Sequence, residues 1–301
     1  MSTMTIVAPG RGSRAQAPRG KGARDSGISR TGAMLIMAVF TVYFLLPLWW
    51  LLVASSKETG DILTTAPLWF ADFHLLDNIA ELFAYRDGVY LRWLLNSVLY
   101  AALGGAIATL LAAMAGYALA KYRFPGRDLM FDIVLGGVLV PATALALPLF
   151  LIFSQAQLTN TFWSVFLPSI VSPFGVYLAR IFAASSVPDE LLEASRLDGA
   201  GEIRTFFTVS IRLMTPALVT MFLFQFVAIW NNFMLPYIML GDDSLFPLTV
   251  GLNGLLNQGA SAPALYTLVI TGALLSVIPL IAIFLVLQRF WRVDLAAGAV
   301  K

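Results

Sequence analysis

The sequence predicts an all-α, polytopic membrane protein with six transmembrane helices and both termini in the cytoplasm. The first observation is the composition, since 59% of the 301 residues are hydrophobic and only 12% are charged. A soluble domain carries about 25% charged residues, so much of this protein's surface must face lipid. The second observation is that the apolar residues form long runs, and the third is that Lys and Arg are distributed unevenly between the connections.

Six apolar runs are each close to the 20 residues that a helix needs to cross about 30 Å of hydrocarbon. They cover roughly residues 32–54, 93–119, 129–153, 162–183, 213–236 and 264–288. The second run is rich in Gly and Ala, which suits either close helix packing or the lining of a substrate path. Pro141 and Pro148 interrupt the third run, and Pro168 and Pro173 lie in the fourth, so kinks are expected in both.

The connections between the runs differ in charge. Most of the 19 Lys and Arg residues lie in the N-terminal tail, in the connections at 120–128 and 184–212, and at the C-terminus. The remaining connections collect mostly Asp and Glu. The positive-inside rule therefore places both termini and the 184–212 loop in the cytoplasm of a multi-pass protein of the cell (plasma or inner) membrane.

The first 30 residues differ from the rest of the chain. They are rich in Gly, Ser, Arg and Pro and contain few apolar residues. Such a segment cannot bury a core, so residues 1–30 are predicted to be a disordered, basic cytoplasmic tail. Residues 31–301 are then the transmembrane domain.

Several kinds of chemistry are excluded by what the sequence lacks. It contains no Cys, and its single histidine, His74, lies in a polar connection and is interpreted as an ordinary loop residue. No Asp, Glu, Lys or Arg lies at the centre of a span, so a proton-coupled carrier and a membrane-embedded hydrolase are both disfavoured. No Walker A pattern is present. The chain is therefore predicted to be no enzyme, to have no catalytic residue and to bind no metal or cofactor directly.

The loop at 184–212 predicts two short helices joined by a turn. Two serines, Pro188 and the acidic residues after it are typical of a helix start, and Gly199 allows the positive φ that ends this helix. A second helix is expected over about 201–209. On a helical wheel, Asp189, Glu193 and Arg196 share one face, opposite Leu191, Leu192, Ala194 and Ser195. Such a pair either lies against lipid headgroups or docks a cytoplasmic protein, and the acidic residues favour docking because anionic lipid repels them.

The residues at the centre of this loop resemble a family motif. Glu193-Ala194-Ser195, followed after two residues by Asp198-Gly199-Ala200, is similar to the EAA motif of ABC importer permeases, the inner-membrane components of binding-protein-dependent transport systems. Further segments resemble maltose-type carbohydrate permeases in the same order and spacing: 115–120 with 123–127, 167–168 with 172–175, 230–233 and 297–301. The chain departs from the family at Ser195, which replaces the second Ala of the motif. It departs again at Ile211-Arg212, which lacks the proline that kinks the family's chain there.

The resemblance implies a type I importer fold and a set of partners. The EAA-like residues, Glu193, Ala194, Ser195, Asp198, Gly199 and Ala200, would form a coupling helix that seats in a cleft of a cytoplasmic ATPase subunit. ATP and Mg would be bound by that subunit, which acts as a dimer. A second permease subunit would complete the translocation path, and an external solute-binding protein would deliver the solute. Membrane lipid would surround the complex, and no nucleic acid is expected among the partners.

The resemblance also suggests roles for the C-terminal tail, for the external segment at 241–263 and for three residues of the fifth span. The C-terminal tail either contacts the ATPase or is a frayed end: Gly298, Ala299, Val300 and Lys301. The external segment at 241–263 either is a flexible hydrogen-bonding probe that reaches into the binding protein or is a plain connection, and its candidate residues are Gly251, Asn253, Gly254 and Asn257. In the fifth span, Trp230, Asn231 and Asn232 either bond to neighbouring helices or line the pore.

The sequence therefore predicts the permease subunit of an ABC importer that forms half of the pore for a sugar or oligosaccharide. Neutral sugars are favoured because a phosphate ester would call for Lys or Arg near the path, and none lies mid-span. Two alternatives stay open. The same architecture could import another solute such as glycerol phosphate, or the protein could be a membrane scaffold that transports nothing.

Overall fold

The structure, a computed structural model, describes residues 27–290, with side chains from Arg30 onward. This part of the chain is helical and contains no strand. The tail at 1–26 and the C-terminal residues 291–301, with the candidate residues Gly298–Lys301, lie outside it. The chain divides after Pro47 into two units, which are described separately.

The first unit contains most of helix α1 (Gly27–Ser55), which begins five residues before the predicted span and so includes the last residues of the predicted tail. Its side chains between 34 and 47 are almost all apolar and exposed, for example Leu35, Val39 and Phe40. A water-soluble protein does not leave such a face open. This helix therefore requires lipid or another protein around it.

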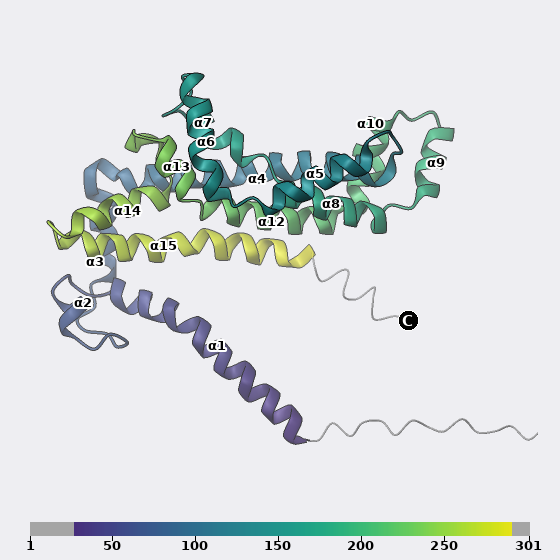
Figure 1. Cartoon of the computed structure of the whole chain (residues 1–301). Coiled ribbons are helices and arrows are strands. Elements are labelled where there is room, and N and C mark those ends of the chain that lie inside the picture. The colour runs from purple at the N-terminus through teal and green to yellow at the C-terminus, as the bar shows by residue number, and fades with distance from the viewer. Residues whose placement is uncertain (1–26, 291–301) are drawn as a thin grey trace, which may run out of the picture. The chain divides into compact units, whose positions relative to one another are not determined.

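The second unit holds the other helices that pack in the membrane part of the fold. Their bounds are Val89–Lys121 (α4), Arg127–Leu139 (α5), Ala142–Gln155 (α6), Phe162–Ser169 (α7), Pro173–Ser186 (α8), Thr215–Trp230 (α12), Met234–Met239 (α13), Leu248–Gly259 (α14) and Ala264–Leu287 (α15). Before α4 lie the short α2 (Asp61–Thr64) and α3 (Leu75–Ala84). Three helices, α4, α8 and α12, run alongside one another and make the most extensive contacts (Figure 1).

The described residues contain four helical segments that are long and apolar enough to cross a membrane: Arg30–Ser55, Leu75–Lys121, Phe162–Ser186 and Ala264–Phe290. Two more crossings are obtained if each of two bent pairs counts as one span. The pair Arg127–Leu139 and Ala142–Gln155 is bent by 102°, and the pair Glu202–Leu213 and Thr215–Trp230 by 84°. The number of spans is thus four to six, and six remains a prediction.

Three predicted spans are each two helices in the structure. The third, at 129–153, is two helices that break at Pro141, because proline has no N–H to donate and restricts the residue before it. Pro148, in contrast, lies inside α6 and does not break it. The fourth, at 162–183, is α7 and α8, which are separated at 170–172, directly before Pro173. The fifth, at 213–236, is wrong as one helix, since α12 ends at Trp230 and the short α13 follows.

The small residues of α4 allow the close approach of its neighbours. A Cβ atom on Gly116 would lie 2.4 Å from the Cβ of Ala179 in α8. A Cβ on Gly104 would lie 2.9 Å from the Cδ1 of Ile229, and one on Gly105 would lie 3.2 Å from the ring of Phe222, both in α12. Helix packing, one of the two alternatives for these residues, is therefore confirmed at these positions.

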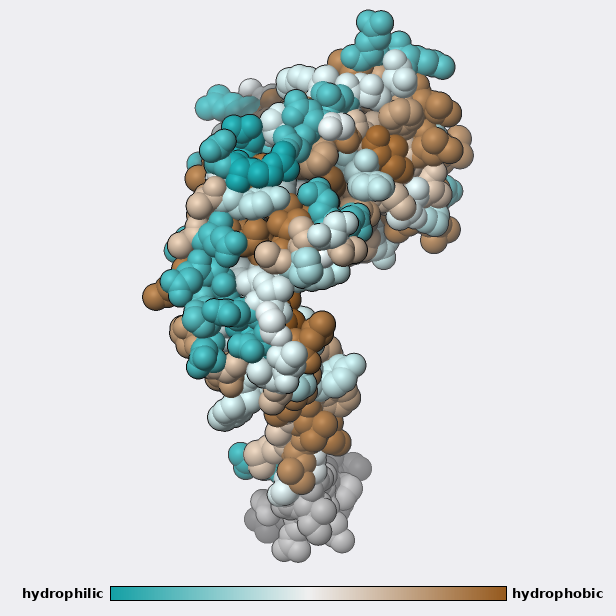
Figure 2. Space-filling model, turned by 90° about the vertical axis from the view of Figure 1, so that its left-hand side faces the viewer, coloured by the Kyte–Doolittle hydropathy of each residue, from teal (hydrophilic) through white to brown (hydrophobic). Residues whose placement is uncertain are grey.

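Two buried apolar clusters hold the second unit together. The larger gathers Tyr90 and Trp93 of α4 with residues of α7, α12, α14 and α15. The smaller, here called the loop-side cluster, joins α4 and α8 to the 184–212 loop; its buried members are Ala112, Ala113, Tyr117, Ala179, Ala183, Val187, Leu192, Phe206, Met214 and Met221. Figure 2 shows many hydrophobic side chains exposed on the outside, as expected where helices face lipid or neighbouring subunits.

Candidate functional site

The 184–212 loop folds as the predicted pair of short helices. Helix α9 (Asp189–Leu197) begins after Pro188, whose extended backbone precedes the first turn. After a turn, α10 (Glu202–Thr205) continues into a π-helix (Phe206–Ser210) and α11 (Ile211–Leu213). Since π-helical turns are rare and occur often at functional sites, this segment is locally unusual.

The turn between α9 and α10 depends on Gly199, as predicted. Its φ is +77°, in the left-handed region that glycine adopts without steric cost. The N–H of Gly199 donates to the carbonyl of Arg196, and the N–H of Ala200 donates to that of Ser195, both at 3.0 Å. These bonds satisfy the last carbonyls of α9 and reverse the chain toward α10.

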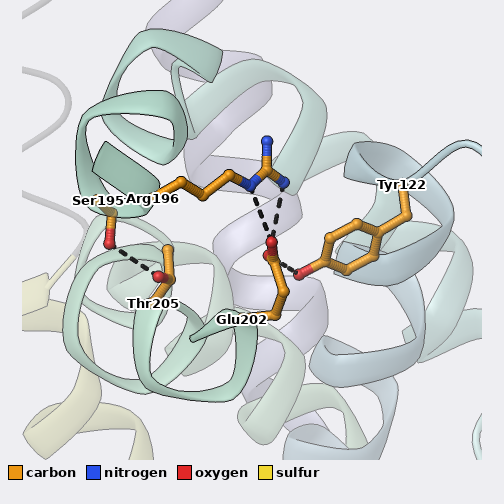
Figure 3. A network of polar contacts seen from close by, with 5 residues as sticks. All are labelled: Tyr122, Ser195, Arg196, Glu202 and Thr205. Carbon is orange, nitrogen blue, oxygen red and sulfur yellow. Dashed lines mark hydrogen bonds and ion pairs between the residues drawn. The ribbon is translucent and has the colours of Figure 1, made fainter. Parts of the chain in front are cut away.

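A network of polar side chains joins the two helices to each other and to the end of α4 (Figure 3). The Ser195 and Thr205 hydroxyls lie 2.8 Å apart, within hydrogen-bond distance. The Nε of Arg196 donates to Oε1 of Glu202 at 2.8 Å. The hydroxyl of Tyr122 donates to Oε2 of the same carboxylate at 2.7 Å. Glu202 therefore connects α9, α10 and the end of α4.

The hydroxyl pair predicts a specific response to mutation. Ser195→Ala leaves Thr205, which is 1% exposed, without its partner, and a buried unsatisfied hydroxyl costs about 1–3 kcal/mol. Ser195→Ala combined with Thr205→Val removes both polar groups and is expected to lie closer to wild type in thermal unfolding of the purified protein. Ser185→Ala is the control, because the exposed Ser185 hydroxyl bonds only within its own helix. A double variant less stable than Ser195→Ala would contradict the pairing.

An ion pair fixes the beginning of α9 to α4. The Nζ of Lys121 lies 2.8 Å from Oδ1 of Asp189. The hydrogen bond from Lys121 and the charge of its ammonium group lower the pKa of the Asp189 carboxyl below its usual value. The pair is therefore fully formed at neutral pH, and its contribution is lost only as the pH falls through that lowered pKa.

The two sides of α9 differ in burial. Leu192, at 3% exposed, inserts into the loop-side cluster. Of the other residues placed on the apolar face, Ser195 is half-buried while Leu191 and Ala194 are exposed. Leu197 is 90% exposed. One leucine thus anchors the helix, and its outer side presents apolar and acidic groups together.

The chain kinks after this loop even though Ile211-Arg212 lacks a proline. The 84° bend falls at Met214, between α11 and α12. Pro216 lies in the first turn of α12, where a missing N–H costs nothing. Met214 is fully buried in the loop-side cluster. The proline four residues beyond Arg212 and the burial of Met214 therefore account for the kink.

Of the predicted residues, Trp230 is the last residue of α12, and Asn231 and Asn232 follow it directly, outside the helix. Trp230 is buried and stacks on Phe226. The Nδ2 of Asn231 donates to the carbonyl of Val227, one turn earlier in its own helix. The bond to a neighbouring helix expected from its amide is therefore not formed. Asn232 instead receives a bond at its backbone carbonyl, from the Thr249 hydroxyl.

Residues 248–259 form helix α14, so the expectation of a flexible loop there is wrong. A Cβ on Gly251 would lie 2.2 Å from the ring of Trp93, which shows that the helix packs closely on α4. Gly254 has open space where its Cβ would be. The Nδ2 of Asn257 donates to Oδ1 of Asn253 at 3.1 Å. The buried Leu248, Val250 and Leu255 explain why this segment is helical.

The structure adds site residues for which the sequence offers little signal. Arg196 and Glu202 carry opposite charges and lie six residues apart in one loop, so an ion pair between them could be considered from the sequence. Tyr122, however, is 80 residues from Glu202 in sequence, and no periodicity links them. His74 does lie in a connection, before α3, near Glu58 and Asp77. Among residues 27–290, no group of three or more His, Asp and Glu is placed to hold a metal ion.

A comparison with known protein families shows to which family the chain belongs. The family described as "Binding-protein-dependent transport system inner membrane component" matches residues 105–292. This range includes the second half of α4, the whole 184–212 loop and α15. The chain belongs to this family. It is the permease component of an ABC importer, located in the inner membrane.

Relatives of this permease align along most of its length. The arabinooligosaccharide transport permease AraQ of Halalkalibacterium halodurans is 34% identical over 257 residues, which cover 85% of this chain and 90% of that protein. The lactose transport permease LacG of Rhizobium radiobacter is 31% identical, with 85% and 90% covered. A crystal structure of a bacterial ABC transporter that imports alginate contains a chain with the same fold, at a TM-score of 0.76 and 21% identity, covering 89% of this permease and 98% of that chain.

Proposed function

We propose that this permease forms half of the translocation path for a sugar or oligosaccharide, which an external solute-binding protein delivers. The observation that carries the proposal is that two relatives, at 31–34% identity, are named as transport permeases for arabinooligosaccharides and for lactose. Both align with about 85% of the chain, so the similarity extends through the membrane helices as well as the cytoplasmic loop.

The charges of the membrane helices support a neutral substrate. In α4 the charged residues, Arg92 and Lys121, lie near its ends, and α12 and α15 contain none, while α8 carries Arg180 in its second half. A phosphorylated substrate would need compensating Lys or Arg groups along its path, because a bare anion at membrane depth is costly. Hydroxyl-rich, uncharged sugars need only hydrogen-bonding partners.

The substrate can be tested through the delivery protein. The transporter is purified from native membranes, the co-purifying solute-binding protein is identified, and its unfolding temperature is measured with a panel of sugars and glycerol phosphate. A sugar is expected to raise this temperature, since a ligand at 100 times its Kd stabilises by about 2.7 kcal/mol. A rise with glycerol phosphate and with none of the sugars would contradict the proposal.

We further infer that α9 seats in a cleft of the ATPase subunit, which binds ATP and Mg. The support is the division of α9 into two sides. Leu192, Lys121–Asp189 and the Glu202 network hold its inner side. The outer side leaves Leu191, Glu193 and Leu197 accessible. An exposed apolar and acidic ridge on a rigid support is suited to a cleft with an apolar floor and basic rim.

The remaining architecture is proposed on the same grounds. Six spans with both termini in the cytoplasm would make each permease one half of a pathway, completed by a second permease subunit and driven by an ATPase dimer. The exposed apolar side chains of α1 between 34 and 47 are consistent with cover by lipid or by that second subunit. The C-terminal residues Gly298–Lys301 are proposed as a second contact with the ATPase.

Charge reversal on the outer side of α9 tests the coupling role. Glu193→Lys is expected to lower the amount of ATPase that co-purifies with the permease about tenfold, which corresponds to roughly 1.4 kcal/mol, because a rim of like charge disfavours association. Solute uptake should fall in parallel. Glu81→Lys, on the exposed external helix α3, is the matched control and should assemble normally. Normal assembly and uptake with Glu193→Lys would remove the coupling role.

A further inference from the structure

A segment without regular helix, at 240–247, connects α13 to α14 and contains only a single short turn, Asp243–Leu245. Its short turn satisfies only a few backbone groups, through the bonds from the N–H of Leu245 to the carbonyl of Asp242 and from the N–H of Phe246 to that of Asp243. Several of its N–H and carbonyl groups are bonded by side chains from elsewhere in the chain. The structure shows that these side chains come from two separate places. One is the connection between α6 and α7, and the other is α4.

On the first side, a single residue supplies the contacts. Oδ1 of Asn160 accepts hydrogen bonds from two consecutive backbone groups, the N–H of Gly241 and the N–H of Asp242, each at 2.9 Å. The N–H of Asn160 itself donates to the carbonyl of Met239 at 2.8 Å. Three bonds therefore tie residues 239–242 to one asparagine that is about 80 positions away in the sequence.

The backbone of Asn160 explains why this residue type is suitable. Its φ is +56°, in the left-handed region that most side chains avoid and that Asn and Asp tolerate. The position therefore demands two properties together, tolerance of positive φ and a carbonyl or carboxylate acceptor. Gly would keep the first and lose the second, whereas Asp would keep both.

On the second side, α4 holds the rest of the segment. The Nε1 of Trp93 donates to the carbonyl of Asp243 at 2.9 Å. The Nδ2 of Asn96 donates to the carbonyls of Ser244 and Phe246, at 2.8 and 3.0 Å. The Ser97 hydroxyl accepts from the N–H of Leu248 at 2.8 Å, where α14 begins. The segment is thus held between α4 and Asn160, and α14 extends directly from it.

We propose that Asn160 is a positioning residue that holds 240–247, and through it α14, in one orientation for docking of the solute-binding protein. This inference rests on the proposed function and on the role that the resemblance implies for the segment at 241–263, which is contact with that protein. Because the same segment is bonded to α4, a displacement of α14 also acts on α4. Helix α4 ends directly before Tyr122, whose hydroxyl bonds to Glu202 of the 184–212 loop.

The orientation of α14 can be measured directly, because this chain contains no cysteine. Spin labels are attached in the assembled transporter through Leu91→Cys on α4 and Leu256→Cys on α14, both exposed positions. Wild type and Asn160→Asp are expected to give one narrow distance distribution. Asn160→Gly, which keeps the backbone and removes the acceptor, should give a clearly broader one. Equal widths in all three would overturn the proposal.

The functional readout separates positioning from general damage. ATPase activity is measured in proteoliposomes against increasing concentrations of the substrate-loaded binding protein that co-purifies with the transporter. Asn160→Gly is expected to raise the half-saturating concentration about tenfold, with the maximal rate within twofold of wild type, and Asn160→Asp should restore it. An unchanged half-saturating concentration would overturn this inference alone. A wild-type transporter that no binding protein stimulates would overturn the proposed function as well.

Discussion

Replacing Gly116 by leucine is expected to separate α4 from α8 and to remove most of the folded permease from the membrane. A Cβ at this position would lie 2.4 Å from the Cβ of Ala179, 2.6 Å from the backbone nitrogen of Arg180 and 2.8 Å from the backbone carbon of Ala179. Two of these atoms are helix backbone and the third is a Cβ, so none of them can rotate away. Overpacking typically costs 1–3 kcal/mol, and a clash with backbone is expected at or above the upper end of that range.

The consequence reaches beyond the two helices. Ala112, Ala179 and Ala183 belong to the loop-side cluster that also buries Leu192 of α9 and Met214 at the kink. A change in the distance between α4 and α8 therefore also displaces the support of the 184–212 loop. The measurement is the yield and unfolding temperature of detergent-purified protein, followed by ATPase co-purification of whatever protein is recovered.

Gly136→Leu is the matched control for this prediction. Gly136 lies in α5, and no atom lies within 4 Å of the position that its Cβ would take. The substitution is expected to leave the unfolding temperature close to wild type or to raise it slightly, because glycine costs about 1 kcal/mol in a helix interior. Equal unfolding temperatures for Gly116→Leu and wild type would show that the close α4–α8 contact is absent in solution.

Replacing Gly199 by valine is expected to lower solute uptake about tenfold or more while the membrane helices stay folded. The φ of +77° costs an L-residue roughly 1–2 kcal/mol and a β-branched one more. Space is not the reason, since nothing lies within 4 Å of the added Cβ. The turn must change its path, which breaks the bonds to the carbonyls of Arg196 and Ser195. Helix α9 then loses its fixed relation to α10, and with it the geometry proposed for the ATPase cleft.

Two controls isolate the backbone conformation. Gly199→Asn keeps a residue that tolerates positive φ and should retain most of the uptake. Gly201→Val places the same bulky side chain two positions later, where φ is −71°, ψ is 158° and the surrounding space is also open. Both variants and Gly199→Val are compared by the ratio of ATPase to permease after purification and by initial uptake rate. A Gly199→Val variant as active as Gly199→Asn would refute the need for this turn.

The features that could be predicted from the sequence are those with local causes. The last span, predicted at 264–288, is helix α15 at Ala264–Leu287, because a long uninterrupted run of apolar residues leaves few alternatives. The second, at 93–119, lies within α4 for the same reason. The positive φ of Gly199 follows from its residue type and from its position after a helix. The break at Pro141 follows from the missing N–H of proline.

The contacts of the candidate site have causes that are distant in the sequence and could not be predicted from it. The hydroxyl pair Ser195–Thr205 and the contact of Tyr122 with Glu202 join segments 10 and 80 residues apart. No rule of composition or periodicity selects one partner among the many side chains that could meet. The substitution of Ser195 for the family's alanine has its explanation only in Thr205, which lies beside it in space.

The linear sequence was sufficient to predict a polytopic membrane protein and the two-helix loop with its glycine turn. It was also sufficient to show the resemblance to importer permeases. The reason is that hydropathy, proline and glycine act over a few residues, whatever surrounds them. The end of α12 at Trp230, the helical state of 248–259 and the bonds of Asn160 to Gly241 and Asp242 required the folded chain. Each depends on packing or hydrogen bonding with a distant segment, and that energy is set by which surfaces meet after folding.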